Sequence, residues 1–170
     1  MIKAGRRPRF LAKNDLFAIP VVGTALRGAN QIPVDRTSSD LTPLRSAEAA
    51  LAKGEVVVIY PEGTVTTSPD SLPMRAKTGV VRLSLASGVP VTPMASWGSQ
   101  AVWQKSGKGS LKFGRPVWVR VGSALDFSER ASQANDREAL HEMTDQVMAA
   151  ITAIVEDLRN RYPKRWTDDG

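Results

Sequence analysis

The sequence predicts an α/β fold in which a mixed, largely parallel sheet is flanked by helices. Residues 56–59 form an uninterrupted β-branched run, Val-Val-Val-Ile, which is typical of a strand buried on both faces in a parallel sheet. Helical and extended patterns alternate along the chain, and strands joined through a helix are parallel neighbours. The length of 170 residues, with no internal repeat, predicts one domain over residues 1–170.

The first half of the chain supplies the start of this sheet. The expected elements are a strand at 9–13, a helix at 15–27, an extended piece at 31–34, a helix ending at Gly54 and a strand at 55–60. Pro20 bends or delays the start of the first helix. Pro33 places the extended piece near a sheet edge or a strand end. The strand at 55–60 is expected to be central in the sheet.

The second half continues the alternation. The expected elements are a helix from Thr78 to Gly88, a strand at 89–95, a half-exposed strand at 117–121 and a closing amphipathic helix at about 135–161. Because a helix joins the strands at 55–60 and 89–95, we expect those two strands to be parallel neighbours. Val80, Leu83 and Ala86 are expected on one side of the connecting helix.

The composition restricts the partners. The 23 basic and 17 acidic residues give a net charge of +6, which favours anionic partners or simply a solubilising surface. No zinc-ligand spacing or aromatic-glycine RNA-binding signature is present, so we expect no nucleic-acid partner and no metal. The absence of cysteine excludes disulfides and a thiolate nucleophile. The apolar stretch at 16–26 is shorter than the ~20 residues of a spanning helix, and no secretion signal is visible.

Polar residues follow the β-branched run directly. Residues 60–64 read Tyr-Pro-Glu-Gly-Thr and open a Ser/Thr/Pro-rich segment with no hydrophobic period. A loop that leaves a buried parallel strand is where α/β proteins usually place their ligand chemistry. Glu62, Gly63 and Thr64 supply a carboxylate, a flexible backbone and a hydroxyl, which suit an oxygen-rich ligand.

Five short blocks in this order resemble a known family. They are Phe-Leu-Ala-Lys at 10–13, Ile-Pro-Val-Asp-Arg at 32–36, Glu-Gly-Thr at 62–64, Lys-Thr-Gly at 77–79 and Val-Pro-Val-Thr-Pro at 89–93. Their order and spacing resemble the glycerolipid acyltransferases, and most closely the 1-acylglycerol-3-phosphate acyltransferases. The resemblance covers residues at about 8–125, and it implies a glycerolipid acyltransferase-like fold.

The resemblance implies an enzyme of phospholipid biosynthesis. Members of that family move a fatty acyl group from acyl-CoA or acyl carrier protein to the free hydroxyl of a lysophosphatidate-like acceptor. No cofactor beyond the acyl donor is expected. The lipid acceptor implies a cytoplasmic protein associated peripherally with the inner face of the membrane. Trp97, Trp103 and Trp118 are candidates for contact with lipid headgroups, with core packing as the alternative for Trp118.

The resemblance also implies substrate-binding residues. Arg36 corresponds to the arginine that binds the substrate phosphate, and a guanidinium suits that task because its fork meets two phosphate oxygens. Glu62, Gly63 and Thr64 correspond to the acceptor pocket, and Lys13 and Lys77 are candidate cations beside it. Each has a plainer alternative. Arg36 can belong to a surface turn, the carboxylate of Glu62 can hold a loop turn, and the lysines can simply be solvated.

One departure concerns the third motif. The family usually continues that motif with arginine or serine, where this chain has Val65. The substitution removes a possible phosphate contact and leaves the identity of the acceptor open.

A second departure concerns the catalytic base. The family's first motif, His-x-x-x-x-Asp, precedes the blocks matched here, so its histidine and aspartate are expected upstream of Met1. The single histidine of the chain, His141, is four residues from Asp145, and we interpret that pair as an ordinary helix-surface pair. No catalytic residue is therefore assigned within residues 1–170.

The missing motif leaves several functions open. The chain is expected to be an N-terminally incomplete acyltransferase with little or no activity alone. The alternatives are a catalytically inactive lipid-binding relative and, more remotely, a basic nucleic-acid-binding domain.

Overall fold

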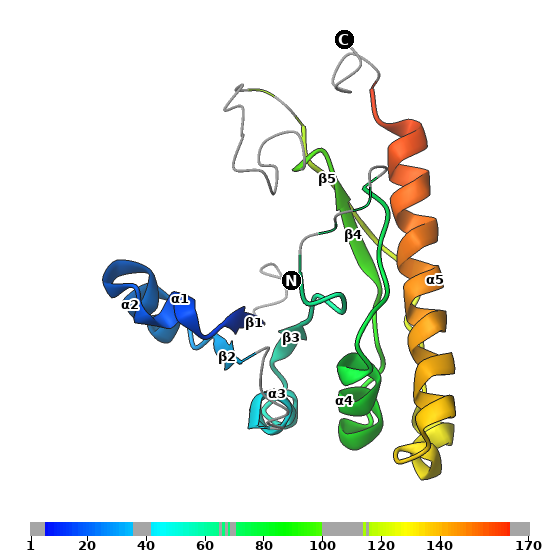
Figure 1. Cartoon of the computed structure of the whole chain (residues 1–170), viewed down its shortest axis with the longest axis horizontal. Helices are drawn as coiled ribbons and strands as arrows, with labels where there is room; N and C mark the ends of the chain where they lie inside the picture. Colours follow the sequence, from blue (N-terminus) through cyan, green and yellow to red (C-terminus); the bar gives the residue numbers. More distant parts are fainter. Residues whose placement is uncertain are drawn as a thin grey trace.

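Two sheets organise the fold (Figure 1). The computed structural model describes residues 6–35, 42–64, 66, 68, 71–99, 114 and 116–163. Within these ranges a three-stranded parallel sheet belongs to the N-terminal region, and a two-stranded antiparallel sheet packs along the long C-terminal helix. This arrangement of parallel and antiparallel pairs with flanking helices confirms the predicted mixed α/β class.

The first sheet is built around the first strand of the chain. Its strands are, in spatial order, β2 (Ile32–Val34), β1 (Pro8–Lys13) and β3 (Val56–Val58). Both pairs are parallel, with Lys13 opposite Val34 and Phe10 opposite Val58. The strand predicted at 9–13 is confirmed, and β2 lies at a sheet edge as its proline indicated. Helix α3 (Thr42–Ala52) packs on the sheet and buries Ala47 beside Ile32.

The predicted helix at 15–27 is broken in two. Helix α1 spans Asp15–Ala18 and helix α2 spans Pro20–Gly28. Ile19 between them is extended, with ψ 122°, because a residue before proline is excluded sterically from the helical region. Pro20 then occupies the first turn of α2, where its missing N–H costs nothing.

The predicted position of the third strand is wrong. β3 is half-buried and lies at an edge of the three-stranded sheet in the described part of the chain, although its β-branched run is typical of a central strand. Strand β4 (Met94–Trp97) is not its parallel neighbour: β4 pairs antiparallel with β5 (Trp118–Val121). A residue pattern indicates only that a segment prefers to be a strand. The strand with which it pairs depends on contacts between residues far apart in the sequence. Here the long C-terminal helix packs against β4.

Helix α4 (Gly79–Ser87) connects the two sheets and packs differently from the prediction. Leu83 is buried and Val80 is partly buried, as predicted, but Ala86 is exposed. Val81 and Leu85 are buried as well, so α4 packs on more than the one predicted side. The Thr78 side chain does not cap the helix, and its Oγ1 accepts a hydrogen bond from Arg82 Nε at 3.3 Å instead. The helix ends as predicted at Gly88, whose φ is +66°.

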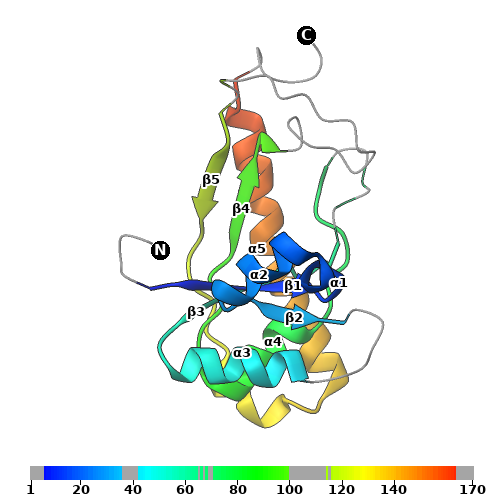
Figure 2. The same cartoon turned by 90° about the vertical axis from the view of Figure 1, so that its left-hand side faces the viewer.

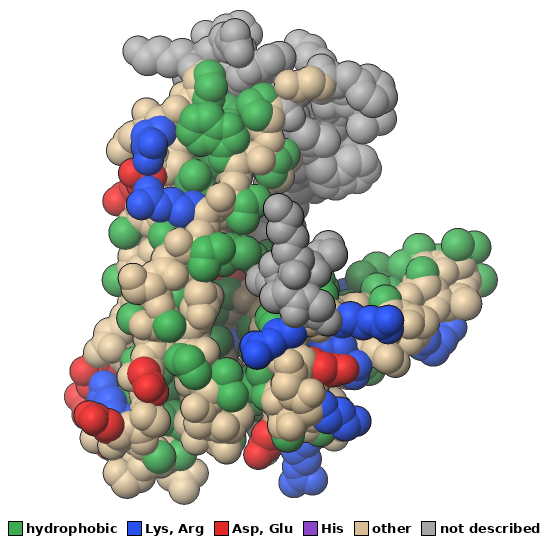
Figure 3. All heavy atoms as spheres, turned by 180° about the vertical axis from the view of Figure 1, so that it is seen from behind, with side chains coloured by type: hydrophobic (Ala, Val, Ile, Leu, Met, Phe, Trp, Pro, Cys, Tyr) green, Lys and Arg blue, Asp and Glu red, His purple; other side chains and the backbone are tan. Residues whose placement is uncertain are grey.

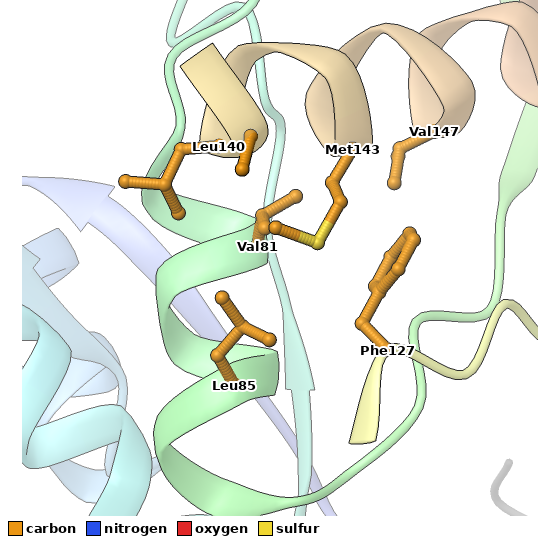
Figure 4. Close-up of a cluster of buried hydrophobic side chains, with 7 residues drawn as sticks. Val81, Leu85, Phe127, Leu140, Met143 and Val147 are labelled. Carbon is orange, nitrogen blue, oxygen red and sulfur yellow. The ribbon is translucent and has the colours of Figure 1, made fainter. Parts of the chain in front are cut away.

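The best-buried core joins α4 to α5 (Arg137–Arg161), the helix predicted at about 135–161. The carboxylate of Asp136 begins α5 by accepting the Glu138 and Ala139 N–H groups at 2.9 and 3.2 Å. Figure 4 shows the α4 and α5 side chains converging with one side chain from the loop that precedes the 3₁₀ helix η3 (Ser128–Gln133). The converging side chains are Val81, Leu85, Phe127, Leu140, Met143 and Val147. Burial of each contributes about 1.5–3 kcal/mol to folding.

A second cluster holds the other end of α5 against the antiparallel sheet. Its buried members are Trp97, Ile154, Val155, Leu158 and Tyr162. The ring of Trp118 meets that of Tyr162 edge-on, with centroids 5.5 Å apart, and the Tyr162 hydroxyl donates to the Pro116 carbonyl at 2.7 Å. Among the described residues, no helix is both long enough and apolar enough to cross a bilayer.

Candidate functional site

The predicted site lies where the three parallel strands end. Because β2, β1 and β3 run in the same direction, their carboxyl ends meet at one edge of the sheet (Figure 2). Lys13 ends β1, Asp35 follows β2 directly, and the loop that holds Glu62 follows β3. The Asn14 N–H donates to the Val34 carbonyl at 3.0 Å and ties two of these strand ends together.

A tight turn presents the Glu62 side chain at this edge. The Gly63 N–H donates to the Tyr60 carbonyl at 2.9 Å, so residues 60–63 form a β-turn with Pro61 second and Gly63 fourth. Gly63 has φ +69°, a conformation that strains residues with a Cβ, and a Cβ built there would meet no atom within 4 Å. The requirement for glycine is therefore conformational, and the space beside the turn is open.

The carboxylate of Glu62 fastens this turn to the segment at 71–77. Glu62 Oε2 accepts the Met74 N–H at 2.8 Å, and the Lys77 N–H donates to the Pro61 carbonyl at 3.0 Å. The interpretation of Glu62 as a carboxylate that holds loop backbone therefore describes its contact in the structure. Sequence reasoning missed its partner, because the segment at 71–77 has no hydrophobic period that would place it. The separation of 12 residues between Glu62 and Met74 carries no local signal either.

The two candidate lysines lie in segments next to this turn and reach outward. The Lys13 side chain is about half exposed and forms an ion pair with the exposed Asp15. Such exposed pairs contribute roughly 0–1 kcal/mol, so this contact leaves the ammonium available to an anion. The Lys77 backbone holds the turn through Pro61, while its side chain is exposed. Thr64 is exposed at the end of the turn.

The predicted phosphate ligand, Arg36, lies outside the described residues, as does Val65. Asp35 is the last described residue before it and continues β2 at the same sheet edge as Lys13. The backbone of the described residues thus brings together the strand ends that carry Lys13 and Glu62, with the Lys77 backbone bonded to the turn. The assignment of these side chains to one substrate stays a prediction.

The catalytic pair has no counterpart at this edge among the described residues. Its histidine and aspartate were expected upstream of Met1, and Met1 itself lies outside the described part of the chain, which begins at residue 6. The location of that pair upstream of Met1 therefore stays a prediction. The single histidine, His141, is half-buried on α5, a helix that packs against α4, β4 and β5 and not against the strand ends that carry Lys13 and Glu62.

Predictions about the tryptophans have different outcomes. The expectation that Trp97 contacts lipid headgroups is wrong, because Trp97 is buried against α5. Trp118 takes the core-packing alternative through its contact with Tyr162. Trp103 lies outside the described residues.

A family model decides the identity. The model described as Acyltransferase matches residues 1–97, which include β1, β2 and β3 and the loop that carries Glu62. The chain belongs to the acyltransferase family. Among the residues that the structure describes, no group of three or more His, Cys, Asp or Glu side chains is placed to hold a metal ion.

Relatives place this acyltransferase more narrowly. It is 28% identical over 154 residues to the 1-acyl-sn-glycerol-3-phosphate acyltransferase of Bacillus subtilis, covering 89% of this chain and 69% of that protein. It is 31% identical over 156 residues to the enzyme of the same name from Pseudomonas aeruginosa, covering 89% of this chain and 59% of that protein. These two matches confirm the predicted resemblance to the 1-acylglycerol-3-phosphate acyltransferases.

A solved structure shares the fold of this acyltransferase. The crystal structure of the 1-acyl-sn-glycerophosphate acyltransferase PlsC from Thermotoga maritima superposes with a TM-score of 0.61 at 26% identity. The alignment covers 93% of this chain and 59% of that one. The chain therefore spans about three-fifths of the PlsC chain.

Proposed function

We propose that this acyltransferase transfers a fatty acyl group from a thioester donor to the free hydroxyl of a lysophosphatidate-like acceptor. The observation that carries the proposal is the family match over residues 1–97, which includes the strand-end loop with Glu62. The donor is acyl-CoA or acyl carrier protein. In the reaction the base removes the hydroxyl proton, the acceptor oxygen bonds to the thioester carbonyl carbon, and the C–S bond breaks. The donor leaves as a thiolate that takes the proton from the base and is released as a thiol.

The acceptor is held at the edge where β1, β2 and β3 end. Arg36, which follows Asp35, binds the acceptor phosphate with its guanidinium fork. The Glu62 turn lines the pocket with Gly63 and Thr64, and the open space beside Gly63 supports this role. Lys13 and Lys77 add positive charge next to the phosphate.

The general base is proposed to be the histidine of a His-x-x-x-x-Asp motif that residues 1–170 do not contain. The position of His141 supports this. His141 is the single histidine of the sequence, and it lies on α5, which does not pack against the strand ends that carry Lys13 and Glu62. A positioned base typically accounts for ~10²- to 10⁴-fold of rate, so residues 1–170 alone retain little or no transfer activity.

Paired binding and transfer measurements test the function. Residues 1–170 are expected to bind lysophosphatidate more tightly than monoacylglycerol, which lacks the phosphate, and Arg36→Gln should weaken lysophosphatidate binding by roughly 10- to 100-fold. Arg45→Gln, at an exposed position on α3, is the matched control and should leave the affinity unchanged. Equal affinities for the two lipids would refute the proposed acceptor.

Extension of the chain separates the two candidate functions. If the reading frame upstream of Met1 encodes the His-x-x-x-x-Asp motif, the extended protein should transfer acyl groups and its His→Ala variant should not. An in-frame stop, together with lysophosphatidate binding but no transfer, would favour the inactive lipid-binding relative. The observation that favours this second candidate is the position of His141 on α5, away from the proposed site.

We propose that the protein works in the cytoplasm at the inner face of the membrane, where its acceptor resides.

A further inference from the structure

Two surfaces of the described residues expose grouped apolar side chains. One is the α1–α2 hairpin (residues 15–28), where Val21 is 81% exposed and where Figure 3 shows hydrophobic side chains with Lys and Arg side chains beside them. The other is the face of the β4–β5 sheet that is turned away from α5, which we call the valine face. Its exposed side chains are those of Met94, Val117, Val119 and Val121. Exposed apolar side chains that are grouped mark an interaction site more often than scattered ones do.

Side chains alternate between the two sides of this sheet, which creates the valine face. Trp97 and Trp118 lie opposite one another, and both belong to the cluster that packs on α5. The next residue along each strand points to the other side of the sheet. Val119 and Val121 are accordingly 60% and 57% exposed, and Met94 lies opposite Val121. The sheet therefore has one face against α5, seen behind β4 and β5 in Figure 2, and one exposed face.

β5 also has an open edge. Among the described residues, β4 is the strand that pairs with β5. The Gly122 N–H donates to the Pro93 carbonyl at 2.9 Å, and in an antiparallel pair the residues that bond to the partner strand alternate with residues that do not. The alternation assigns Trp118 and Arg120 to the bonds with β4, whereas Val119 and the valines two residues away direct their backbone groups outward. Such an edge can accept a further strand.

β5 lacks the features with which edge strands usually oppose pairing. Lysine, proline and bulges serve this purpose in natural sheets. Residues 118–121 read Trp-Val-Arg-Val, which are types that favour strands, and contain neither lysine nor proline. The one charged side chain, that of Arg120, is used in an ion pair with Asp157 of α5. The edge is therefore open to a partner strand.

The charges of the two apolar surfaces favour different occupants. Residues 6–31 carry five basic side chains and one acidic side chain, Asp15, so the surface around the hairpin is cationic and two copies of it would repel each other. The four side chains of the valine face are uncharged, and the nearby Arg120 is paired on the other side of the sheet. Two copies of this chain can therefore meet at the valine face without like-charge repulsion.

We propose that β5 pairs antiparallel with β5 of a second copy of this chain and thereby joins two β4–β5 sheets into one. Antiparallel pairing of identical strands has two-fold symmetry, so the strand is complementary to itself. Val119 lies opposite Val119 of the second copy, and Val117 lies opposite Val121, because this register pairs the outward backbone groups of all three valines. The valine side chains then gain neighbours across the new strand pair. The dimer goes beyond the acyl transfer proposed above and does not depend on it.

Sedimentation velocity of residues 1–170 tests the dimer. A weak dimer is expected, with a Kd of roughly 10–100 µM, because the pairing of one short strand buries a small interface. Val119→Glu with Val121→Glu should raise the Kd at least about 100-fold, since carboxylates of the two copies would lie side by side. Val21→Glu with Val22→Glu, on the exposed part of the hairpin, is the matched control and should leave the Kd unchanged.

A thiol introduced at the two-fold axis tests the register. The chain has no cysteine, so Val119→Cys provides a single thiol. In the proposed register the Cα atoms of the two residues at this position lie about 5.5 Å apart, within the range of a disulfide. Oxidation with diamide should link Val119→Cys into a dimer at least about tenfold faster than Val21→Cys, because pairing raises the effective concentration of the second thiol.

Three results would overturn the inference. They are a monomer at about 1 mM protein, equal dissociation of the dimer by the hairpin variant, and equal rates of disulfide formation at the two thiol positions. Far-ultraviolet circular dichroism of each variant confirms that its helices are intact. If the pair of glutamates lowers the helix content, the thiol measurement, which changes one exposed valine, still decides. None of these readouts needs lysophosphatidate or acyl transfer, so the dimer and the proposed function can each fail without the other.

Discussion

The two regions of this acyltransferase use apolar residues in opposite ways. In the region of α4, α5, β4 and β5, apolar side chains meet in two clusters, and Leu140 and Met143 are fully buried. In the region of β1, β2, α1 and α2, Ile32 is buried while Phe10 and the hairpin side chains stay exposed. The family match includes all of the second region and, of the first region, only α4 and β4. We therefore expect the first region to supply most of the stability and the second to supply surfaces for ligands.

The largest expected effect breaks the core of the C-terminal region. Leu140→Ala should lower the free energy of unfolding by about 2–5 kcal/mol, because it leaves a cavity between α5 and α4. Val21→Ala, which truncates an equally apolar but exposed side chain, should change it by less than about 0.5 kcal/mol. Urea unfolding followed by circular dichroism measures both. Comparable losses would mean that the hairpin is buried in solution and that the contrast between the regions is false.

The next effect concerns the joint between the Glu62 turn and the segment at 71–77. Glu62→Ala removes the acceptor of the Met74 N–H and should cost about 1–3 kcal/mol of stability. Glu62→Gln keeps an acceptor oxygen at the same place and should cost less. If Glu62 also serves the acceptor pocket, both variants weaken lysophosphatidate binding, whereas a purely structural carboxylate would leave the glutamine variant with normal affinity.

Local structure was largely predictable from the sequence, and its assembly was not. The strand at 9–13 and the closing helix follow from residue periodicity, and the break before Pro20 follows from proline sterics. The antiparallel pairing of β4 with β5 could not be predicted, because the pairing of strands depends on contacts between residues far apart in the sequence. The same limit hid the Glu62 bond to Met74 and the burial of Trp97, because each depends on where another segment packs.

A smaller effect compares the glycine of the Glu62 turn with the glycine that ends α4 in the C-terminal region. Gly63 and Gly88 have φ values of +69° and +66°, and a Cβ at either would meet no atom within 4 Å. Backbone strain alone therefore predicts a similar cost of about 1–2 kcal/mol for Gly63→Ala and Gly88→Ala in urea unfolding. Lysophosphatidate binding should separate them, since Gly63 belongs to the proposed pocket. If Gly88→Ala lowered the affinity for lysophosphatidate as much as Gly63→Ala did, the lower affinity would come from global destabilisation and not from a change in the proposed pocket.

The smallest effect is electrostatic and belongs to the C-terminal region. Arg130 Nη2 donates to Glu142 Oε2 at 2.8 Å, and this hydrogen bond lowers the pKa of Glu142 below its ordinary value of 4.5 and raises that of Arg130. A carboxyl with a lower pKa in the folded state stabilises the fold above its unfolded pKa, and that contribution is lost as the pH falls through the folded value. Glu142→Gln should therefore lower the urea midpoint slightly at pH 7.

The difference between wild type and Glu142→Gln should then shrink as the pH is lowered below about 4.5, because both chains become uncharged at this position. Asp126, whose pKa is lowered by the Ser128 N–H, titrates in the same range, but it is present in both chains and cancels in the difference. A constant difference across the acid range would show that the Arg130 contact acts through packing of its side chain and not through charge. In that case the Arg130–Glu142 pair would contribute no charge-dependent stability to the C-terminal region, which would sharpen its contrast with the cationic surface around α1 and α2.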